Sequence, residues 1–281
     1  MRSIFLPDSL EMLWSALEET PEAMVYAGGT DLLVKLRQKL IDPPSLICLE
    51  RIKKLKGVRD QGGEVWIGAG STHADLLLDK IIQREFPVLV KALMTLGSPL
   101  IRNMGTIGGN ICTASPAGDM LPPLYVLNAE VEIRSKHVYQ RLPLKDFILG
   151  PGKTCLSIDQ IVSGIWIKKS SEFNIHHFEK VGQRKAMSIA IASFTALLRI
   201  SKSGIIERAH LAWGSVAPTI VTSAHVEECV IGKTLSMGTL QKAIPFVQDA
   251  VNPIDDIRAS TSYRRAVAEN LLLRLLEIKY D

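Results

Sequence analysis

The sequence has few of the residues that mark metal-cluster or disulfide-rich proteins. Its 281 residues include four cysteines, Cys48, Cys112, Cys155 and Cys229, and no two of them form a CxxC pair. Because zinc and iron–sulfur sites usually take ligands from closely spaced cysteines, we expect no intrinsic metal cluster. The same wide spacing offers no disulfide framework.

Targeting signals and nucleic-acid signals are also scarce. The N-terminal stretch MRSIFLPDSLEMLW has acidic residues within its apolar run and no small-residue cleavage site, so it does not predict a signal peptide. No apolar run reaches the roughly 20 residues that span a bilayer. The net charge is only +4, and the one dense basic run, residues 51–59, has no interleaved aromatic residues to stack bases. We expect a cytoplasmic protein that binds neither membrane nor nucleic acid.

The patterns that are present predict a globular α+β protein of about two domains. Residues 8–19 predict a helix capped by Asp8 or Ser9, and a strand (MVYAGG), a helix (TDLLVKLRQKL) and a strand (SLICLE) follow. Residues 57–166 predict mainly strands, GGNICTAS among them, with one helix in FPVLVKALMTLG and a loop in LGPGKTCLSIDQ. After residue 175, the strands IAIASFTALLRI and AHLAWGSVAP precede two closing helices.

Two loops with adjacent glycines carry the candidate binding chemistry. AGGTDLL occupies residues 27–33, and GTIGGN occupies residues 105–110. Adjacent glycines allow a positive φ and a close approach of ligand to main chain, and consecutive N–H groups then form an anion-binding nest. Neither loop contains Lys or Arg, which suits a diphosphate held by the backbone. Either loop alone is most simply a turn, but two such loops, each after a predicted strand, favour one shared ligand.

Three other glycine motifs do not qualify as nucleotide sites. IGAGSTHADL starts like a dinucleotide fingerprint, but His73 stands where the third glycine is needed. GPGKT and IGKTL have Phe147 and Glu227 where a phosphate loop needs its first glycine. Asp119, which follows the second glycine loop, could accept hydrogen bonds from sugar or ribityl hydroxyls, or could cap a helix that begins near Met120.

Taken together, these motifs resemble one family. AGGTDLL, IRNMGTIGGNICTASPAGDMLPPL, NAEVEI, GPGK, FEKVGQRKAMSIAIAS, LAWGSVAPT and PIDDIRASTSYRRAVAENLLLRLL resemble, in this order, the FAD-binding medium subunit of molybdenum hydroxylases of the xanthine dehydrogenase type. The resemblance covers nearly the whole chain. It implies a two-subdomain FAD-binding region of the PCMH or vanillyl-alcohol-oxidase-like kind over residues 1–170, with subdomains of about 1–56 and 57–170. A C-terminal flavoprotein domain with an antiparallel sheet and helices would occupy residues 171–281.

The resemblance also implies contacts with the cofactor. FAD would lie extended between the two subdomains, with Asp119 as an acidic contact, Ile161 against the flavin half and Lys180 near the isoalloxazine on a mobile loop. Because this loop varies in length, Glu179 is an alternative to Lys180. Ser188 departs from the family, which often has an acidic residue there, and this puts the docking of a nicotinamide acceptor in question. The residues implied to wrap the pyrophosphate are Ala27, Gly28, Gly29, Thr30, Asp31 and Leu32, and Thr106, Ile107, Gly108, Gly109 and Asn110.

The implied function is electron transfer within a complex. A molybdopterin-binding large subunit and a small subunit with 2Fe–2S clusters would oxidise the organic substrate, and this chain would pass the electrons through FAD to NAD+ or another acceptor. The GPGK block and the NIC after the double glycine favour the xanthine dehydrogenase branch. Flavin subunits of carbon monoxide, aldehyde and N-heterocycle dehydrogenases are the alternatives. No catalytic base is expected, because the adjacent His176 and His177 would point to opposite faces of a strand.

Two hypotheses of other classes stay open. A stand-alone nicotinamide-dependent dehydrogenase would need the fingerprint that fails at His73, and a flavin spectrum would exclude it. A non-enzymatic adaptor, in which the glycine loops are only structural, would be colourless and would take up no added FAD.

Overall fold

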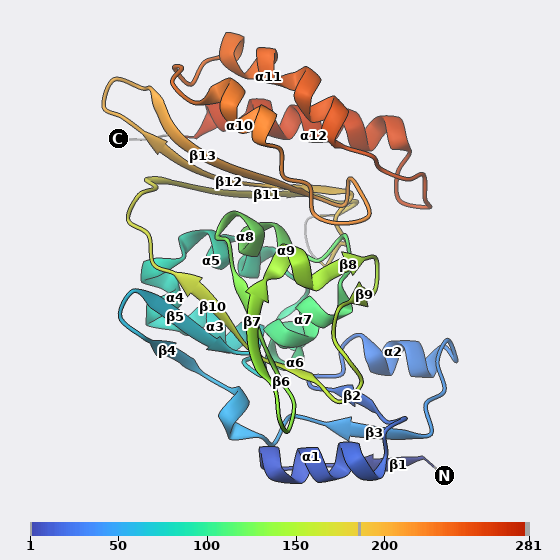
Figure 1. Cartoon of the computed structure of the whole chain (residues 1–281). Helices are drawn as coiled ribbons and strands as arrows, with labels where there is room; N and C mark the ends of the chain where they lie inside the picture. The colour runs from blue at the N-terminus through green and yellow to red at the C-terminus, as the bar shows by residue number, and fades with distance from the viewer. Residues whose placement is uncertain (1, 185–186, 279–281) are drawn as a thin grey trace. The chain divides into compact units, whose positions relative to one another are not determined.

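The computed structural model describes residues 2–184 and 187–278, whose contacts divide the chain into two compact units (Figure 1). As far as its residues are described, the first unit comprises Met1–Ile82, Ser98–Ala114 and Ala129–Lys168, and the second comprises Gln83–Gly97, Ser115–Asn128 and Lys169–Asp281. Two earlier segments of the sequence therefore pack with the C-terminal part. Across the described ranges, no helix combines the length and the apolar character needed to cross a membrane.

The first unit begins with a small parallel sheet of order β1-β3-β2. Its strands are β1 (Ser3–Phe5), β2 (Met24–Tyr26) and β3 (Ser45–Cys48), and they are joined by α1 (Leu10–Glu19) and α2 (Leu32–Arg37). Ser9 caps α1 by accepting a hydrogen bond from the amide of Met12, and Leu13 and Leu17 of this helix are buried. The structure confirms this sequence-based prediction, with Ser9 rather than Asp8 as the cap.

A five-stranded antiparallel sheet of order β4-β5-β10-β6-β7 forms the rest of the scaffold of this unit. Alternation along the strands buries Val65, Ile67 and Ile165 on one face, while aromatic and charged side chains such as Trp66 and Trp166 occupy the other. The strands are β4 (Val58–Asp60), β5 (Glu64–Gly68), β10 (Ile161–Lys168), β6 (Glu130–Arg134) and β7 (Tyr139–Pro143).

The helices between these strands are short, and they correct the sequence-based prediction. GGNICTAS, expected to be a strand, forms α7 (Ile107–Thr113). The helix expected in FPVLVKALMTLG is confirmed as α5 (Pro87–Thr95), but several short helices beside it were not expected. The predicted loop LGPGKTCLSIDQ contains a small hairpin of β8 (Ile148–Gly150) and β9 (Lys153–Thr154). Helices of four to seven residues do not sustain a periodic apolar pattern, so hydrophobic periodicity misses them. The others are α3 (His73–Leu78), α4 (Lys80–Glu85), which crosses into the second unit, α6 (Pro99–Met104), α9 (Leu144–Phe147) and the 3₁₀ turn η1 (Lys53–Leu55).

The second unit is built on a three-stranded antiparallel sheet of order β11-β12-β13. Figure 1 shows three helices, α10 to α12, on one side of this sheet, and α5 and α8 on the other. Both faces are covered, which explains why β12 is buried along nearly its whole length. The predicted antiparallel strands and closing helices are confirmed. The elements are α5 (Pro87–Thr95), α8 (Leu121–Val126), β11 (Ile175–Val181), β12 (Ala192–Ile200), β13 (Ile206–Gly214), α10 (Ala224–Val230), α11 (Met237–Ala250), α12 (Thr261–Leu273) and the 3₁₀ turn η2 (Arg274–Glu277).

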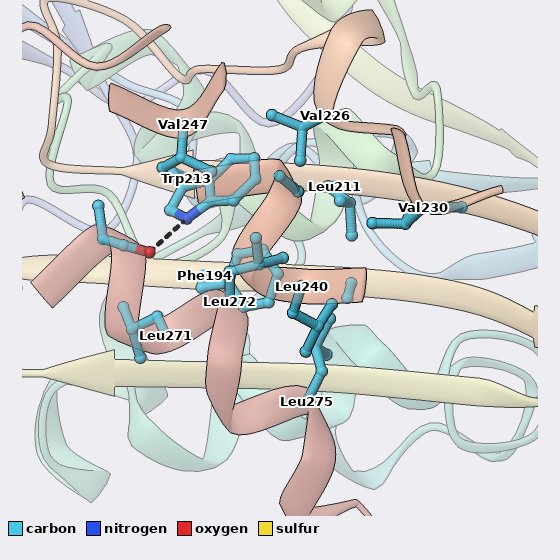
Figure 2. Packing of buried hydrophobic residues seen from close by; sticks show 14 of the residues in the cluster. Phe194, Leu211, Trp213, Val226, Val230, Leu240, Val247, Leu271, Leu272 and Leu275 are labelled. Atoms are coloured by element: carbon cyan, nitrogen blue, oxygen red, sulfur yellow. Dashed lines mark hydrogen bonds between the residues drawn. The ribbon is translucent and has the colours of Figure 1, made fainter. Parts of the chain in front are cut away.

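The core of the second unit centres on two aromatic residues whose rings are in contact at a tilt (Figure 2). The rings of Phe194 and Trp213 have centroids 4.8 Å apart, and both side chains are fully buried. The indole of Trp213 donates a hydrogen bond of 3.1 Å to the carbonyl of Ala268 in α12. This bond satisfies the one polar atom of the ring and attaches the last long helix to the sheet.

Candidate functional site

The two glycine loops lie against each other in the first unit. A Cβ atom built on Gly28 would stand 2.5 Å from the carbonyl carbon of Met104, closer than the 3.0 Å that real Cβ atoms keep. One built on Gly105 would stand 3.3 Å from the hydroxyl oxygen of Thr30. Residues 28–30 and 104–105 are therefore in direct contact, as a shared ligand requires.

The first loop is an open main-chain cradle. It starts directly after β2, and Gly29 adopts a φ of +69°, in the left-handed region that favours glycine. The amide groups of Gly28, Gly29, Thr30 and Asp31 donate no hydrogen bond to any described residue. Four consecutive unpaired N–H groups are donors that an anion can use, and anion binding by this loop stays a prediction.

The second loop is not a nest of free amides, which corrects the sequence-based interpretation. The amides of Ile107 and Gly108 donate to the carbonyls of Ser71 and Ala69 at 3.1 and 2.9 Å. Gly109 donates to the hydroxyl of Thr106, which caps α7, and Asn110 donates to the Thr106 carbonyl. These amides are used within the chain, so the loop supplies a wall of the site rather than a second set of donors.

The glycine-rich segment 67–72 supports this wall. A Cβ on Gly108 would stand 2.6 Å from the Cβ of Ala69, so Gly108 is required for packing and not to leave room for a phosphate. Ser71 in turn receives a hydrogen bond from the amide of Gly57, and Thr72 caps α3 in a reciprocal capping box with Asp75. Sequence reasoning dismissed this segment as a failed fingerprint. Its glycines were the only sign of its supporting role.

Two buried side chains with unpaired atoms lie in this part of the first unit. The carbonyl oxygen of the Asn110 side chain is buried and accepts no hydrogen bond from the described residues. The amide of His73 donates to the carbonyl of Gly105, while its ring Nδ1 has no partner among them. Burial, together with the charge of Arg102, lowers the pKa of His73 to about 4, so its ring is neutral at physiological pH.

In the second unit, Asp119 and Lys180 form a buried ion pair of 2.6 Å. The ammonium of Lys180 also donates to the carbonyl of Thr95 at 2.8 Å. Burial raises the pKa of Asp119, and the charge of Lys180 opposes that rise. The second carboxylate oxygen of Asp119 is buried without a partner in the described chain, and no side chain caps α8, so the helix-cap reading of Asp119 does not hold.

Lys180 lies within β11 and not on a loop, which corrects the expected element. Its neighbour Glu179 pairs with Arg274 at 2.9 Å and lies 3.6 Å from His177. The two side chains therefore have separate partners. The predicted loop begins only at Gly182, and two residues of this block, 185 and 186, lie outside the described residues.

Ile161 is buried and Cys112 is half-buried, and among the described residues neither side chain has a polar partner that indicates a role. Ile161 is 2% exposed and belongs to the apolar cluster with Leu13 and Ile47. Loss of solvent raises the pKa of the Cys112 thiol to about 12, which leaves it protonated and unreactive. Within residues 2–184 and 187–278, no three His, Cys, Asp or Glu side chains are grouped as metal ligands.

Two family models match the chain. The FAD-binding domain of molybdopterin dehydrogenases matches residues 1–168, and the C-terminal domain of the carbon monoxide dehydrogenase flavoprotein matches residues 177–278. The chain belongs to the family of FAD-binding medium subunits of molybdenum hydroxylases. It is thus the flavin subunit of an oxidoreductase, and its α+β fold has the FAD-binding and C-terminal flavoprotein parts expected of this family.

The chain is similar to flavin subunits of dehydrogenases that act on different substrates. The FAD subunit of nicotinate dehydrogenase from Eubacterium barkeri is 28% identical over 277 residues, 96% of this chain and 93% of the relative. The FAD-binding subunit of xanthine dehydrogenase from Escherichia coli O157:H7 is 29% identical over 278 residues, with 98% and 93% covered. A solved structure of carbon monoxide dehydrogenase from Hydrogenophaga pseudoflava superposes with a TM-score of 0.92 at 26% identity and covers 98% of this chain and 96% of that one.

The residues of the first unit fit the cofactor of this family. A diphosphate needs several donors and no proton transfer, and the four unpaired amides at residues 28–31 supply such donors. The unpaired side-chain oxygen of Asn110 is an acceptor, so it suits a hydroxyl of the cofactor and not a phosphate oxygen. Asp31 of the first loop pairs with Lys35 at 2.7 Å, and the loop has no Lys or Arg of its own, so the donors that it offers to a diphosphate are backbone amides.

Proposed function

We propose that this chain is the flavin subunit of a xanthine dehydrogenase-like molybdenum hydroxylase and that its electron acceptor is NAD+. Electrons would come from 2Fe–2S clusters of a small partner subunit, and a large partner subunit would carry molybdopterin. The xanthine dehydrogenase relative, at 29% identity over nearly the whole chain, supports this choice. Bound FAD supplies the ability to accept electrons singly and release them in pairs.

The observation that carries the proposal is the set of unpaired amides in the first glycine loop. Gly28, Gly29, Thr30 and Asp31 would bind the pyrophosphate oxygens through their N–H groups, flanked by Ala27 and Leu32. Because these amides have no acceptor within the described chain, no internal hydrogen bond would have to break when they bind the pyrophosphate. The hydroxyl of Thr30, which contacts Gly105, would complete the cradle on the side of the second loop.

The second loop would orient the cofactor rather than hold its charge. Thr106 to Gly109 form the wall, and the Asn110 side chain would accept a hydroxyl hydrogen. Asp119, Ile161 and Lys180 remain predicted contacts of the flavin half. Lys180 would act with Asp119 as a pair, because its ammonium is held by that carboxylate. The proposed FAD-binding domain is residues 1–170, and the proposed C-terminal domain is residues 171–281.

An N-heterocycle hydroxylase is the second candidate, and the nicotinate dehydrogenase relative favours it. The two candidates share the flavin chemistry and differ in the large subunit, so the assay must supply that subunit. The chain should be co-expressed with molybdopterin-binding and 2Fe–2S subunits and tested for NADH formation with xanthine and with nicotinate. NADH formed with xanthine but not nicotinate supports the proposal.

Each part of the proposal fails in its own way. Turnover with nicotinate but not with xanthine would refute xanthine as the substrate and would support an N-heterocycle hydroxylase. Turnover with an artificial dye but not NAD+ would refute the acceptor. A purified chain that is colourless and takes up no added FAD would point to the non-enzymatic adaptor.

A further inference from the structure

A pocket of about 200 Å³ opens on the polar face of the five-stranded sheet in the first unit. None of its lining residues belongs to either glycine loop. Register places Arg59, Trp66 and Trp166 side by side across β4, β5 and β10, so their side chains share this face. Leu10 and Leu55 supply an apolar wall.

The floor of the pocket is a buried carboxylate whose hydrogen-bonding capacity is fully used. Glu132 is 1% exposed, and its two oxygens accept hydrogen bonds from four groups. Burial alone would raise the pKa of Glu132, but hydrogen bonds from Ser163 and Trp166 and the charge of Arg134 hold it below its ordinary value. The donors are Ser163 at 2.5 Å, Arg134 at 3.0 Å, Trp166 at 2.8 Å and Tyr139 at 3.1 Å.

Other donors of the pocket are not used by this network. The indole N–H of Trp66 donates to none of the described residues, and its ring lies across Gly164, where a Cβ would stand 2.7 Å from the indole Cε2. The Arg59 guanidinium stacks 4.4 Å above the Trp66 ring and forms no ion pair with a described carboxylate. Among residues 2–184 and 187–278, the ion-pair partner of Lys54 is the exposed Glu11, at 3.7 Å.

The pocket groups that have no partner in the network of Glu132 determine which kind of ligand the pocket can bind. Because Arg134 offsets the charge of Glu132, the cations left in the pocket are Lys54 and Arg59, and with the free indole N–H of Trp66 they select an anion. The indoles of Trp66 and Trp166 and the apolar wall select a flat, apolar body. A cavity of about 150 Å³ can hold benzene, so 200 Å³ admits one ring with a carboxylate.

We propose that this pocket binds a small planar organic anion, an aromatic or heteroaromatic carboxylate of a single ring. The ring lies against the tryptophan side chains, and the carboxylate pairs with Arg59 and Lys54 at the rim. The site is separate from the FAD cradle and does not depend on the proposed function.

The hydrogen-bond network of Glu132 does not need these groups. Arg134, Tyr139, Ser163 and Trp166 satisfy Glu132 without the charge of Arg59 or the indole N–H of Trp66. Arg141 offers a contrast on the same face. It also stacks on a tryptophan, 3.3 Å above Trp166, but it is paired with Glu64 at 3.1 Å and does not line the pocket.

Calorimetric titration of the full chain with three probes tests the proposal. Benzoate is planar and anionic, benzamide is planar and neutral, and cyclohexanecarboxylate is anionic but not planar. We expect benzoate to bind at least about tenfold more tightly than either of the others, since each lacks one of the two recognition elements.

Variants locate the binding. Arg59→Gln and Lys54→Gln should each weaken benzoate binding by about tenfold, the effect of losing one charge-assisted contact. Arg199→Gln, an exposed strand arginine of the second unit, changes the net charge equally and should have no effect. Gly28→Ala, which disrupts the FAD cradle, should leave benzoate binding intact.

Several outcomes overturn the proposal. These are no benzoate binding, equal binding of benzoate and cyclohexanecarboxylate, or an affinity unchanged by both Arg59→Gln and Lys54→Gln. Loss of benzoate binding in Gly28→Ala would show that benzoate binds in the FAD cradle and not in this pocket. Unfolding midpoints equal to that of the unmodified chain confirm that both rim variants are folded.

Discussion

Replacing Gly28 by alanine tests the contact between the two glycine loops. The new Cβ would overlap the carbonyl of Met104, whose carbon atom would be only 2.5 Å away, and real Cβ atoms keep at least 3.0 Å. The Cβ atom is bonded directly to the main chain and the Met104 carbonyl is part of it, so rotation of a side chain cannot relieve the overlap. The loops must separate, and the four amides at residues 28–31 then lose their alignment.

The cost follows from the size of this overlap. Inserting one carbon into a well-packed site typically costs about 1–3 kcal/mol. The FAD-bound protein must keep the two loops in contact, whereas the FAD-free protein can relax. The whole cost then appears in the affinity for FAD. At about 1.4 kcal/mol for each factor of ten, FAD should bind about 5- to 150-fold more weakly. We expect Gly28→Ala to lose most of its flavin during purification.

Flavin absorbance per chain, followed by titration of the FAD-free protein with FAD, measures this effect. Gly63→Ala is a matched control, because a Cβ there meets nothing within 4 Å. A second pair is Gly29→Ala with Gly62→Ala, both with positive φ, of which only Gly29 lies in the cradle. Stoichiometric flavin in Gly28→Ala, with an affinity equal to that of Gly63→Ala, would refute the placement of the diphosphate.

Three further predictions concern stability. Since burial and Arg102 hold the pKa of His73 at about 4 against 6.5 in solution, the folded state resists protonation, and stability should fall by up to about 3 kcal/mol as the pH drops from 6.5 to 4. His73→Asn should flatten that part of the pH profile, and an unchanged slope would contradict the assignment. Burial would raise the pKa of Asp256, but hydrogen bonds from Arg258 and Arg264 lower it to about 2, so its contribution should be present above pH 3.8 and be lost between 3.8 and 2. Denaturant unfolding of Asp256→Asn at pH 3 and pH 7 should show a smaller difference than in the unmodified chain. Trp213→Phe should lower the unfolding free energy by about 1–3 kcal/mol, through the lost bond to Ala268 and an imperfectly filled core, and an unchanged unfolding midpoint would contradict this.

The elements that the sequence predicted correctly are those with a sustained local signal. The helix at residues 10–19 has a capping serine and an apolar stripe, β12 is mostly apolar, and β13 ends in the apolar run of residues 211–213. Local signals suffice there because local preference and tertiary packing agree. The first glycine loop was predicted for the same reason, since a turn with positive φ at Gly29 needs little outside information.

The second loop could not be predicted in this way. Two glycines disfavour a helix, and only the capping hydroxyl of Thr106 and the packing of Gly108 on Ala69 make GTIGGN the start of one. That packing joins residues about forty positions apart, so no window of sequence contains it. Pocket residues such as Arg59 and Glu132 were missed because cross-strand register, and not a motif, brings them together.

The unequal hydrogen bonding of the two loops has a consequence for the empty protein. Amides 107–110 are already paired, whereas amides 28–31 have no acceptor among the described residues. Hydrogen–deuterium exchange in the FAD-free state should therefore be slow in one loop and fast in the other, and the flavin should slow only the fast one. Inorganic phosphate or sulfate in a storage buffer would compete for the same four donors, so cofactor retention should depend on the choice of buffer anion.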